Sequence, residues 1–284
     1  MAEALEVYFY ECGLSPWGIV QKERTDPYAV FGFFPDTAAA DRALGELRAA
    51  FPELPEDFEL QEVIDADWQN AYKKFVKPWS DRQLHWIPLW DREDCTPPEG
   101  SAIVYLDAGM AFGTGCHETT RLCARRLIDF YEARFIEGTP LKIVDAGCGS
   151  GVLAFSAVAL GFEDVRGFDY DADVLSVCEG NAQENPHLAK IPFSVGTLET
   201  GLIPKECDLL LANIQTNVLI PDSDYLIKAL KDGGTLALSG ILVSEIKAVQ
   251  EHFHARCVAL RGAGFTMDSR EDEEWADLCL QLEN

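Results

Sequence analysis

One stretch of the chain, KIVDAGCGSGVLAFSAVALGFEDVRGFD, combines three glycines with two carboxylates that could bind a cofactor. The glycines are Gly147, Gly149 and Gly151, and the carboxylates are Asp145 and Asp169. Glycine permits a sharp turn and lets a ligand approach the backbone closely. A helix that begins after such a turn offers free N–H groups. An acidic residue at the end of the next strand can accept hydrogen bonds from ribose hydroxyls. We therefore expect a site for a ribose-containing cofactor.

The spacing of the glycines favours one kind of cofactor over another. A dinucleotide site follows G-x-G-x-x-G, and its third glycine would fall where the chain has Val152. Asp145 would repel a pyrophosphate, but it would not repel a sulfonium cation that also carries an ammonium group. The pattern thus favours S-adenosylmethionine, with S-adenosylhomocysteine as the product. A tight turn that binds no ligand is the alternative.

The segments that must position these residues alternate between strand and helix patterns. We expect strands over residues 101–107, 142–144, 165–168, 191–195, 207–213, 235–239, 256–265 and 275–282, and helices over residues 152–160, 171–183, 217–230 and 244–254. Such alternation predicts a doubly wound, mostly parallel α/β sheet with an antiparallel pair of C-terminal strands. Ligands bind beyond the carboxyl ends of such strands. Asp145, Asp169 and Asn213 lie at such ends.

A second candidate for ligand contact is the glycine-rich loop AGMAFGTGCHETT, residues 108–120, which precedes a predicted helix. Glycines, threonines and a histidine before a helix are typical of a ligand-contacting loop, and a simple glycine-rich connection is the alternative. His117 could accept a proton, or it could only bond a neighbouring carbonyl.

Three regions follow one another along the chain. Residues 1–64 are expected to form a small α+β, ferredoxin-like domain, with strands at 5–10, 28–34 and 58–64 and a helix capped at Asp36 or Thr37. Residues 65–100 hold four of the six tryptophans and several prolines, so we expect a packed connector, either a hinge or a decoration on the second domain. Residues 101–284 carry the cofactor motifs.

Composition limits the partners and the compartment. The net charge of −25 argues against direct nucleic-acid binding and favours a basic partner, although it could also serve solubility alone. The sequence has no apolar run of the ~18–20 residues that span a bilayer and no pattern of a signal peptide. We therefore expect a cytoplasmic protein with no membrane segment. None of the nine cysteines forms a C-x-x-C pair, so we expect reduced thiols and no metal site.

Several segments together resemble the ribosomal protein L11 methyltransferase (PrmA) family. They are the glycine turn, the AFGTGCHETT loop, the CDLLLANI strand, the connector motifs DWQNAYKKF and LHWIPLW, and LALSGIL at residues 236–242. The resemblance implies an S-adenosylmethionine-dependent enzyme that methylates amino groups, on lysine side chains or the N-terminus, of ribosomal protein L11. It also implies a small N-terminal substrate-recognition domain. By motif, the cofactor contacts fall on Thr120, Gly147, Asp169 and Asn213, and Gly149 belongs to the same turn.

The chain departs from the family pattern along the route of the incoming amine. Cys116 and Glu118 replace a threonine and a proline, and Gln215 and Thr216 replace a Leu-Ala pair. A lysine or small-amine methyltransferase with another substrate therefore stays open, as does a non-catalytic regulator that binds S-adenosylmethionine. Asn213 is the catalytic candidate, because its carbonyl oxygen could accept a hydrogen bond from the amine. A cofactor contact or a strand-end cap is its alternative role.

Overall fold

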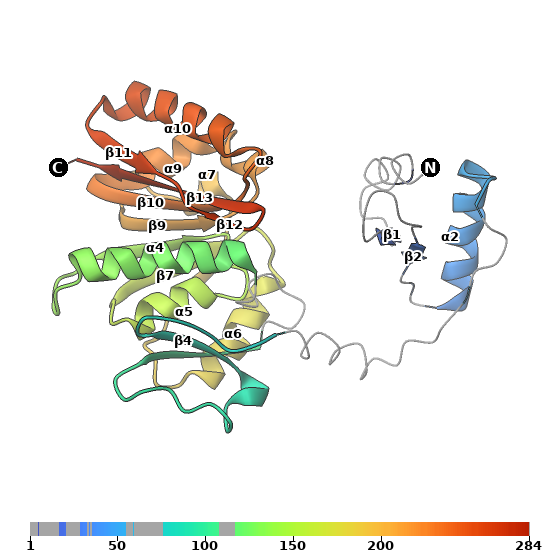
Figure 1. Cartoon of the computed structure of the whole chain (residues 1–284), viewed down its shortest axis with the longest axis horizontal. Helices are drawn as coiled ribbons and strands as arrows, with labels where there is room; N and C mark the ends of the chain where they lie inside the picture. The colour runs from blue at the N-terminus through green and yellow to red at the C-terminus, as the bar shows by residue number, and fades with distance from the viewer. Residues whose placement is uncertain are drawn as a thin grey trace. The chain divides into compact units, whose positions relative to one another are not determined.

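The structure is a computed structural model of the 284-residue chain (Figure 1). It describes Leu5, Phe34 and Glu59 and the ranges 17–20, 29–32, 36–54, 76–107 and 117–283. The chain divides into two compact units, Met1–Val63 and Ile64–Asn284. Every element that carries a predicted cofactor residue belongs to the second unit.

The first unit contains a strand pair and a helix. β1 (Trp17–Val20) pairs antiparallel with β2 (Ala29–Gly32), and α2 (Thr37–Ala50) follows. Asp36 caps α2 as predicted, because its side chain accepts a hydrogen bond from the Ala39 amide at 2.7 Å. Leu5 is helical, so the strand expected to begin there was wrong at that residue. The rest of that strand, and nearly all of the one expected over 58–64, lie outside the described residues, so the ferredoxin-like domain stays a prediction.

The second unit is built on a sheet with the strand order β11-β13-β10-β9-β6-β7-β8. The parallel strands are β6 (Lys142–Ala146), β7 (Asp164–Asp169), β8 (Phe193–Val195), β9 (Cys207–Asn213) and β10 (Leu230–Leu242). The antiparallel strands are β11 (Phe265–Asp268), β12 (Glu271–Asp272) and β13 (Trp275–Leu282). The predicted parallel sheet with an antiparallel C-terminal pair is confirmed.

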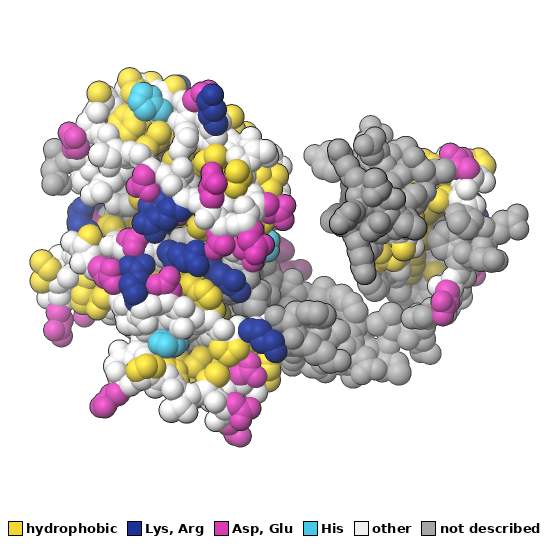
Figure 2. Space-filling view, viewed as in Figure 1, with side chains coloured by type: hydrophobic (Ala, Val, Ile, Leu, Met, Phe, Trp, Pro, Cys, Tyr) yellow, Lys and Arg dark blue, Asp and Glu magenta, His cyan; other side chains and the backbone are white. Residues whose placement is uncertain are grey.

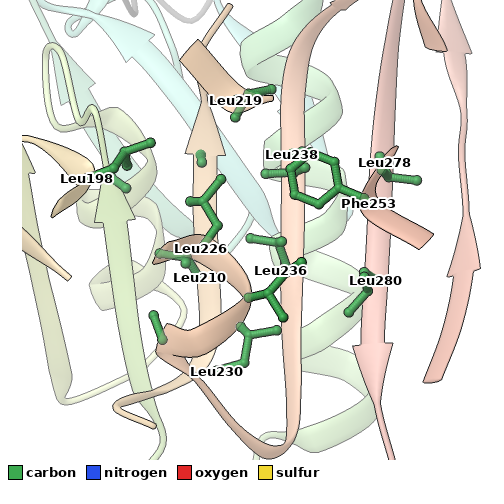
Figure 3. Close-up of a cluster of buried hydrophobic side chains, with 14 of the residues drawn as sticks. Leu198, Leu210, Leu219, Leu226, Leu230, Leu236, Leu238, Phe253, Leu278 and Leu280 are labelled. Carbon is green, nitrogen blue, oxygen red and sulfur yellow. The ribbon is translucent and has the colours of Figure 1, made fainter. Parts of the chain in front are cut away.

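Helices cover both faces of this sheet, as its strand sequences require. Leu209, Leu211 and Ala237 pack with α4 (Glu118–Arg134) and α5 (Val152–Ala159). The residues that alternate with these in the same strands, such as Leu210 and Leu236, point to the other face. There they pack with α9 (Ser223–Ala229) and α10 (Ile246–Arg261). Figure 3 shows this second cluster, with Leu236 and Leu238 of β10 beside Phe253 of α10. The described part of this unit also contains α6 (Val174–Glu184), α7 (Leu198–Gly201) and α8 (Thr216–Leu219).

A smaller sheet lies outside the main one and includes part of the expected connector. β3 (Trp79–Asp81) and β4 (Leu84–Pro88) precede a 3-10 turn at Leu89–Asp91, and β5 (Ala102–Leu106) completes the order β3-β4-β5. Trp86 is buried, and its indole N–H donates to Ser156 Oγ of α5 at 2.7 Å. β4 is thus anchored to the second unit, although the expected boundaries at 64 and 100 remain predictions.

Two expected elements near the C-terminus were wrong in part. The helix expected over 217–230 is two short helices, α8 and α9, because Pro221 interrupts the backbone hydrogen bonds between them. Its last residue, Leu230, begins β10 instead. The strand expected over 256–265 is mostly the end of α10, which buries Phe253 and Cys257 at helical spacing and ends at Gly262, where φ is +84°.

Candidate functional site

The register of the parallel strands aligns the predicted site residues at one edge of the sheet. Ala146 of β6 lies opposite Phe168 of β7 and Ala212 of β9. The next residue after each of them is one that the sequence predicts for the site: Gly147, Asp169 and Asn213. All three therefore lie at the carboxyl ends of adjacent strands, where ligands bind in open α/β sheets.

The glycine turn between β6 and α5 has a backbone that other residues would strain. Gly147, Gly149 and Gly151 have φ values of +68°, +51° and +80°, in the left-handed region that glycine adopts without cost. A Cβ at Gly147 would lie 2.9 Å from Cγ1 of Ile214. The amides of Gly147 and Cys148 donate to the Phe168 carbonyl at 2.8 and 3.0 Å, so the turn is tied to β7.

Asp169 is buried and joins the turn to the end of β7. Its Oδ2 accepts a hydrogen bond from the Gly149 amide at 3.0 Å, and its Oδ1 accepts one from the Asp171 amide at 3.1 Å. These two donors fix the plane of the carboxylate. Each oxygen keeps a further lone pair, so the group can still accept hydrogen bonds from a ligand's hydroxyls.

Thr120 and Asn213, far apart in sequence, contact each other. The Asn213 side-chain amide donates to Thr120 Oγ1 at 3.2 Å, and Thr120 is buried in the first turn of α4. This contact commits the side-chain nitrogen of Asn213 and leaves Oδ1 as its other polar atom. Oδ1 is buried and has no hydrogen-bond partner among the described residues.

Asp145 lies in β6, two residues before Gly147, and its carboxyl group is buried. Its Oδ2 accepts from the Ala154 amide at 3.0 Å, whereas Oδ1 has no hydrogen-bond partner in the described part of the chain. Burial raises the pKa of Asp145 to about 7; the Ala154 amide opposes this shift and the charge of Asp169 adds to it. A cation bound nearby would stabilise the ionised form.

His117 caps the helix that carries Thr120. The Thr119 amide donates to His117 Nδ1 at 3.3 Å, and the ring lies edge-on to Trp275 with 5.0 Å between centroids. These contacts give His117 a structural role at the start of α4. The loop before it, including Cys116, lies outside the described residues.

Sequence reasoning missed Ser239 as a site residue. Ser239 of β10 lies opposite Asn213 of β9 and is fully buried. Its Oγ has no hydrogen-bond partner within the described ranges. The sequence signal that could have identified Ser239 is that it is the polar residue in the otherwise apolar run LALSGIL.

The described residues show neither a metal cluster nor a membrane-spanning helix. They contain no group of three or more His, Cys, Asp or Glu side chains placed to hold a metal ion. They also contain no helix that is both long enough and apolar enough to cross a membrane.

The chain is similar to known proteins in both sequence and structure. The model of the family described as ribosomal protein L11 methyltransferase (PrmA) matches residues 11–283. The chain is 37% identical over 249 residues to a ribosomal protein L11 methyltransferase of Geobacter sulfurreducens, covering 87% of the chain and 76% of that relative. It is 33% identical over 273 residues to the protein of the same name from Pelotomaculum thermopropionicum, covering 94% and 83%.

A solved structure gives the same result. The crystal structure of a ribosomal protein L11 methylase from Lactobacillus delbrueckii subsp. bulgaricus has a TM-score of 0.59 and 27% sequence identity to this chain. The match covers 72% of this chain and 97% of that one.

Proposed function

The chain belongs to the ribosomal protein L11 methyltransferase (PrmA) family, and we propose that it transfers methyl groups from S-adenosylmethionine to amino groups of ribosomal protein L11. The family resemblance and the Rossmann-like methyltransferase fold expected from the sequence are confirmed. The observation that carries the proposal for the site is the alignment of the glycine turn, Asp169 and Asn213 at one carboxyl edge.

The polar groups of this edge fit S-adenosylmethionine. We assign its contacts to Thr120, Gly147, Gly149, Asp169 and Asn213. The Asp169 carboxylate has lone pairs for ribose hydroxyls. Glycine at position 147 puts no side chain of its own between the backbone and a ligand. Buried polar atoms in proteins normally have a partner. Oδ1 of Asp145, two residues before Gly147, has no partner within the described chain and suits a cofactor that carries sulfonium and ammonium charges.

In the proposed methyl transfer, the protein's residues position a neutral amine of the substrate. Bound S-adenosylmethionine supplies the electrophilic methyl group. A lysine amine of pKa ~10.4 costs about 4 kcal/mol to deprotonate near neutral pH, and an α-amine of pKa ~7.7–8.0 costs far less. We propose that Asn213 Oδ1 accepts an N–H of this amine. The contact of Asn213 with Thr120 supports this role, because it commits the amide nitrogen and leaves the oxygen for the substrate.

A basic substrate is supported by the charges around the edge. The segments that follow β7 and β9, residues 170–189 and 214–227, and the hairpin residues 271–276 contain aspartates and glutamates but no lysine or arginine. Four lysines lie near strand starts, at Lys142, Lys190, Lys205 and Lys231, whereas Lys247 lies in the first turn of α10, after β10. Basic side chains also gather along α4 (Figure 2), but Arg82, Arg125 and Arg270 there are paired with carboxylates.

We also propose a division of labour between regions of the chain. Residues 1–64 would recognise ribosomal protein L11, residues 65–100 would connect, and residues 101–284 would carry the transfer. All five assigned cofactor residues belong to the second compact unit, which supports this division. A ribosomal protein substrate also favours the cytoplasm as the compartment.

The test is label transfer from tritiated S-adenosylmethionine to purified ribosomal protein L11 by the full chain. Label in L11 is expected, and Asn213→Ala should lower the rate at saturating substrates at least 10-fold. Asn217→Ala, an exposed asparagine in α8, is the matched control. The same reaction is run with cell lysate in place of L11. Label in a lysate protein other than L11 would support the alternative substrate, and no label in any protein would support the regulator.

Cofactor binding is tested separately by calorimetry. Asp169→Ala should weaken S-adenosylmethionine about 10- to 100-fold, because a hydrogen bond to a charged group contributes ~1.5–3 kcal/mol. The exposed Asp173→Ala should bind as the wild type does. Unchanged affinity in Asp169→Ala, or tighter binding of NAD than of S-adenosylmethionine, would contradict the assignment.

A further inference from the structure

Ser239 lies beside Asn213 on the face of the sheet that α4 covers. The two residues are paired in register between the parallel strands β10 and β9. Side chains alternate along a strand, and paired residues point to the same face. Ala237, two residues earlier, packs in the cluster with α4 and α5, whereas Leu238 packs in the opposite cluster (Figure 3). Ser239 therefore shares the face of Ala237 and Asn213.

The backbone holds these two side chains close together. The Ile214 amide donates to the Ser239 carbonyl at 3.2 Å. Gly240 follows with φ of +81°, and a Cβ there would lie 2.7 Å from the Ile214 carbonyl oxygen. Glycine thus lets β10 lie tightly against the chain that leaves β9. The fixed backbone on both sides leaves little freedom for Ser239 and Asn213 to move apart.

The Ser239 hydroxyl makes no hydrogen bond that the described chain provides. Its side chain is 0% exposed, and its Oγ is unpartnered among the described residues, as is Oδ1 of Asn213. An unsatisfied buried hydroxyl is unfavourable, and alanine would avoid it. Two unpartnered acceptor atoms on one face, at the edge where the transfer takes place, point to a ligand that brings two donors.

We propose that Ser239 Oγ and Asn213 Oδ1 together hold the two N–H groups of the incoming primary amine. This inference rests on the proposed function and extends it to the substrate side of the site. With both N–H groups held, the lone pair of the amine faces the methyl group. The amine nitrogen forms the new N–CH₃ bond, the electron pair of the S–CH₃ bond returns to sulfur, and the product ammonium releases a proton to water.

The test compares Ser239→Ala, Ser239→Thr and Ser156→Ala in the full chain. Ser156 is a matched control, because it is also fully buried but its hydroxyl is already bonded to Trp86 and to the Val152 carbonyl. Three quantities are measured for each variant: the rate of L11 methylation at saturating substrates, the affinity for S-adenosylmethionine, and the melting temperature.

Ser239→Ala should lower the saturated rate about 3- to 10-fold, the range for one neutral hydrogen bond, with cofactor affinity within 2-fold of wild type. Ser239→Thr keeps the hydroxyl and should restore most of the rate. Ser156→Ala should lower the melting temperature without changing the saturated rate.

Other results overturn the inference. An unchanged rate in Ser239→Ala would show that the hydroxyl holds no amine. Weakened cofactor affinity with an unchanged saturated rate would assign it to S-adenosylmethionine. A folded Ser239→Thr variant that stays as slow as Ser239→Ala would show that the hydroxyl is not the cause. If the wild type itself fails to label L11, the proposed function fails, which is a distinct result.

Discussion

Asp145 gives a prediction in which stability and cofactor binding are linked through one proton. Burial holds the pKa of this carboxyl group at about 7, against 3.8 for an ordinary aspartate. At a pH between these two pKa values, Asp145 therefore keeps its proton in the folded state but has lost it in the unfolded state. Folding is favoured by this group at low pH, and the contribution is lost as the pH rises through about 7.

The magnitude follows from the two pKa values. Between pH 5 and pH 8 the wild type should lose about 2–3 kcal/mol of unfolding free energy through Asp145 alone. Asp145→Asn carries no titrating group there and should lack this loss. The assay is urea unfolding at both pH values. The unfolding free energies of wild type and variant are compared at each pH. Asp232→Asn is the control, because the Asp232 side chain is 64% exposed. This variant should show the same pH dependence of the unfolding free energy as the wild type.

The pH dependence of cofactor affinity should have the opposite sign to that of stability: affinity should rise with pH. If the S-adenosylmethionine cation is bound best by ionised Asp145, the wild type should bind it about 10-fold tighter at pH 8 than at pH 6, relative to Asp145→Asn. Calorimetry at the two pH values measures this ratio. The reasoning is refuted if wild type and Asp145→Asn show the same pH dependence of stability, since the carboxyl group would then titrate normally.

Further predictions concern the ion pairs near the site and fragments of the chain. Asp277 is fully buried and forms a two-point ion pair with Arg126 of α4 at 2.7 and 2.8 Å, so Asp277→Asn should cost about 3–5 kcal/mol in urea unfolding. Arg82→Ala, which removes partly exposed ion pairs, should cost about 1 kcal/mol or less; equal losses would contradict the role of burial. A fragment that begins at Ile64 should fold and bind S-adenosylmethionine by calorimetry but lose methylation of L11. Full activity in that fragment would show that the first unit does not recognise the substrate. A fragment that begins near Glu99 lacks β3 and β4 and should be less stable.

The elements predicted most accurately from the sequence are those with an apolar pattern that is complete within the element itself. The strands over 207–213 and 275–282 were predicted with their observed bounds, because apolar residues there run between clear breaks. The helix expected over 217–230 failed because Pro221 divides it into two short helices and its last residue already belongs to a strand. The anchoring of β4 was not predictable, since burial of Trp86 depends on Ser156, 70 residues away.

The same distinction separates the predictable part of the site from the rest. Gly147 and Asp169 come from one continuous motif, so their spacing alone indicates a cofactor turn. The contact of Thr120 with Asn213 joins residues 93 positions apart, and its geometry depends on how α4 lies across the sheet. Ser239 is harder still, because a strand shifted by one residue would turn its hydroxyl to the opposite face. The register between β9 and β10 is set by the packing of both faces, so the position of that hydroxyl beside Asn213 emerges only from the folded sheet.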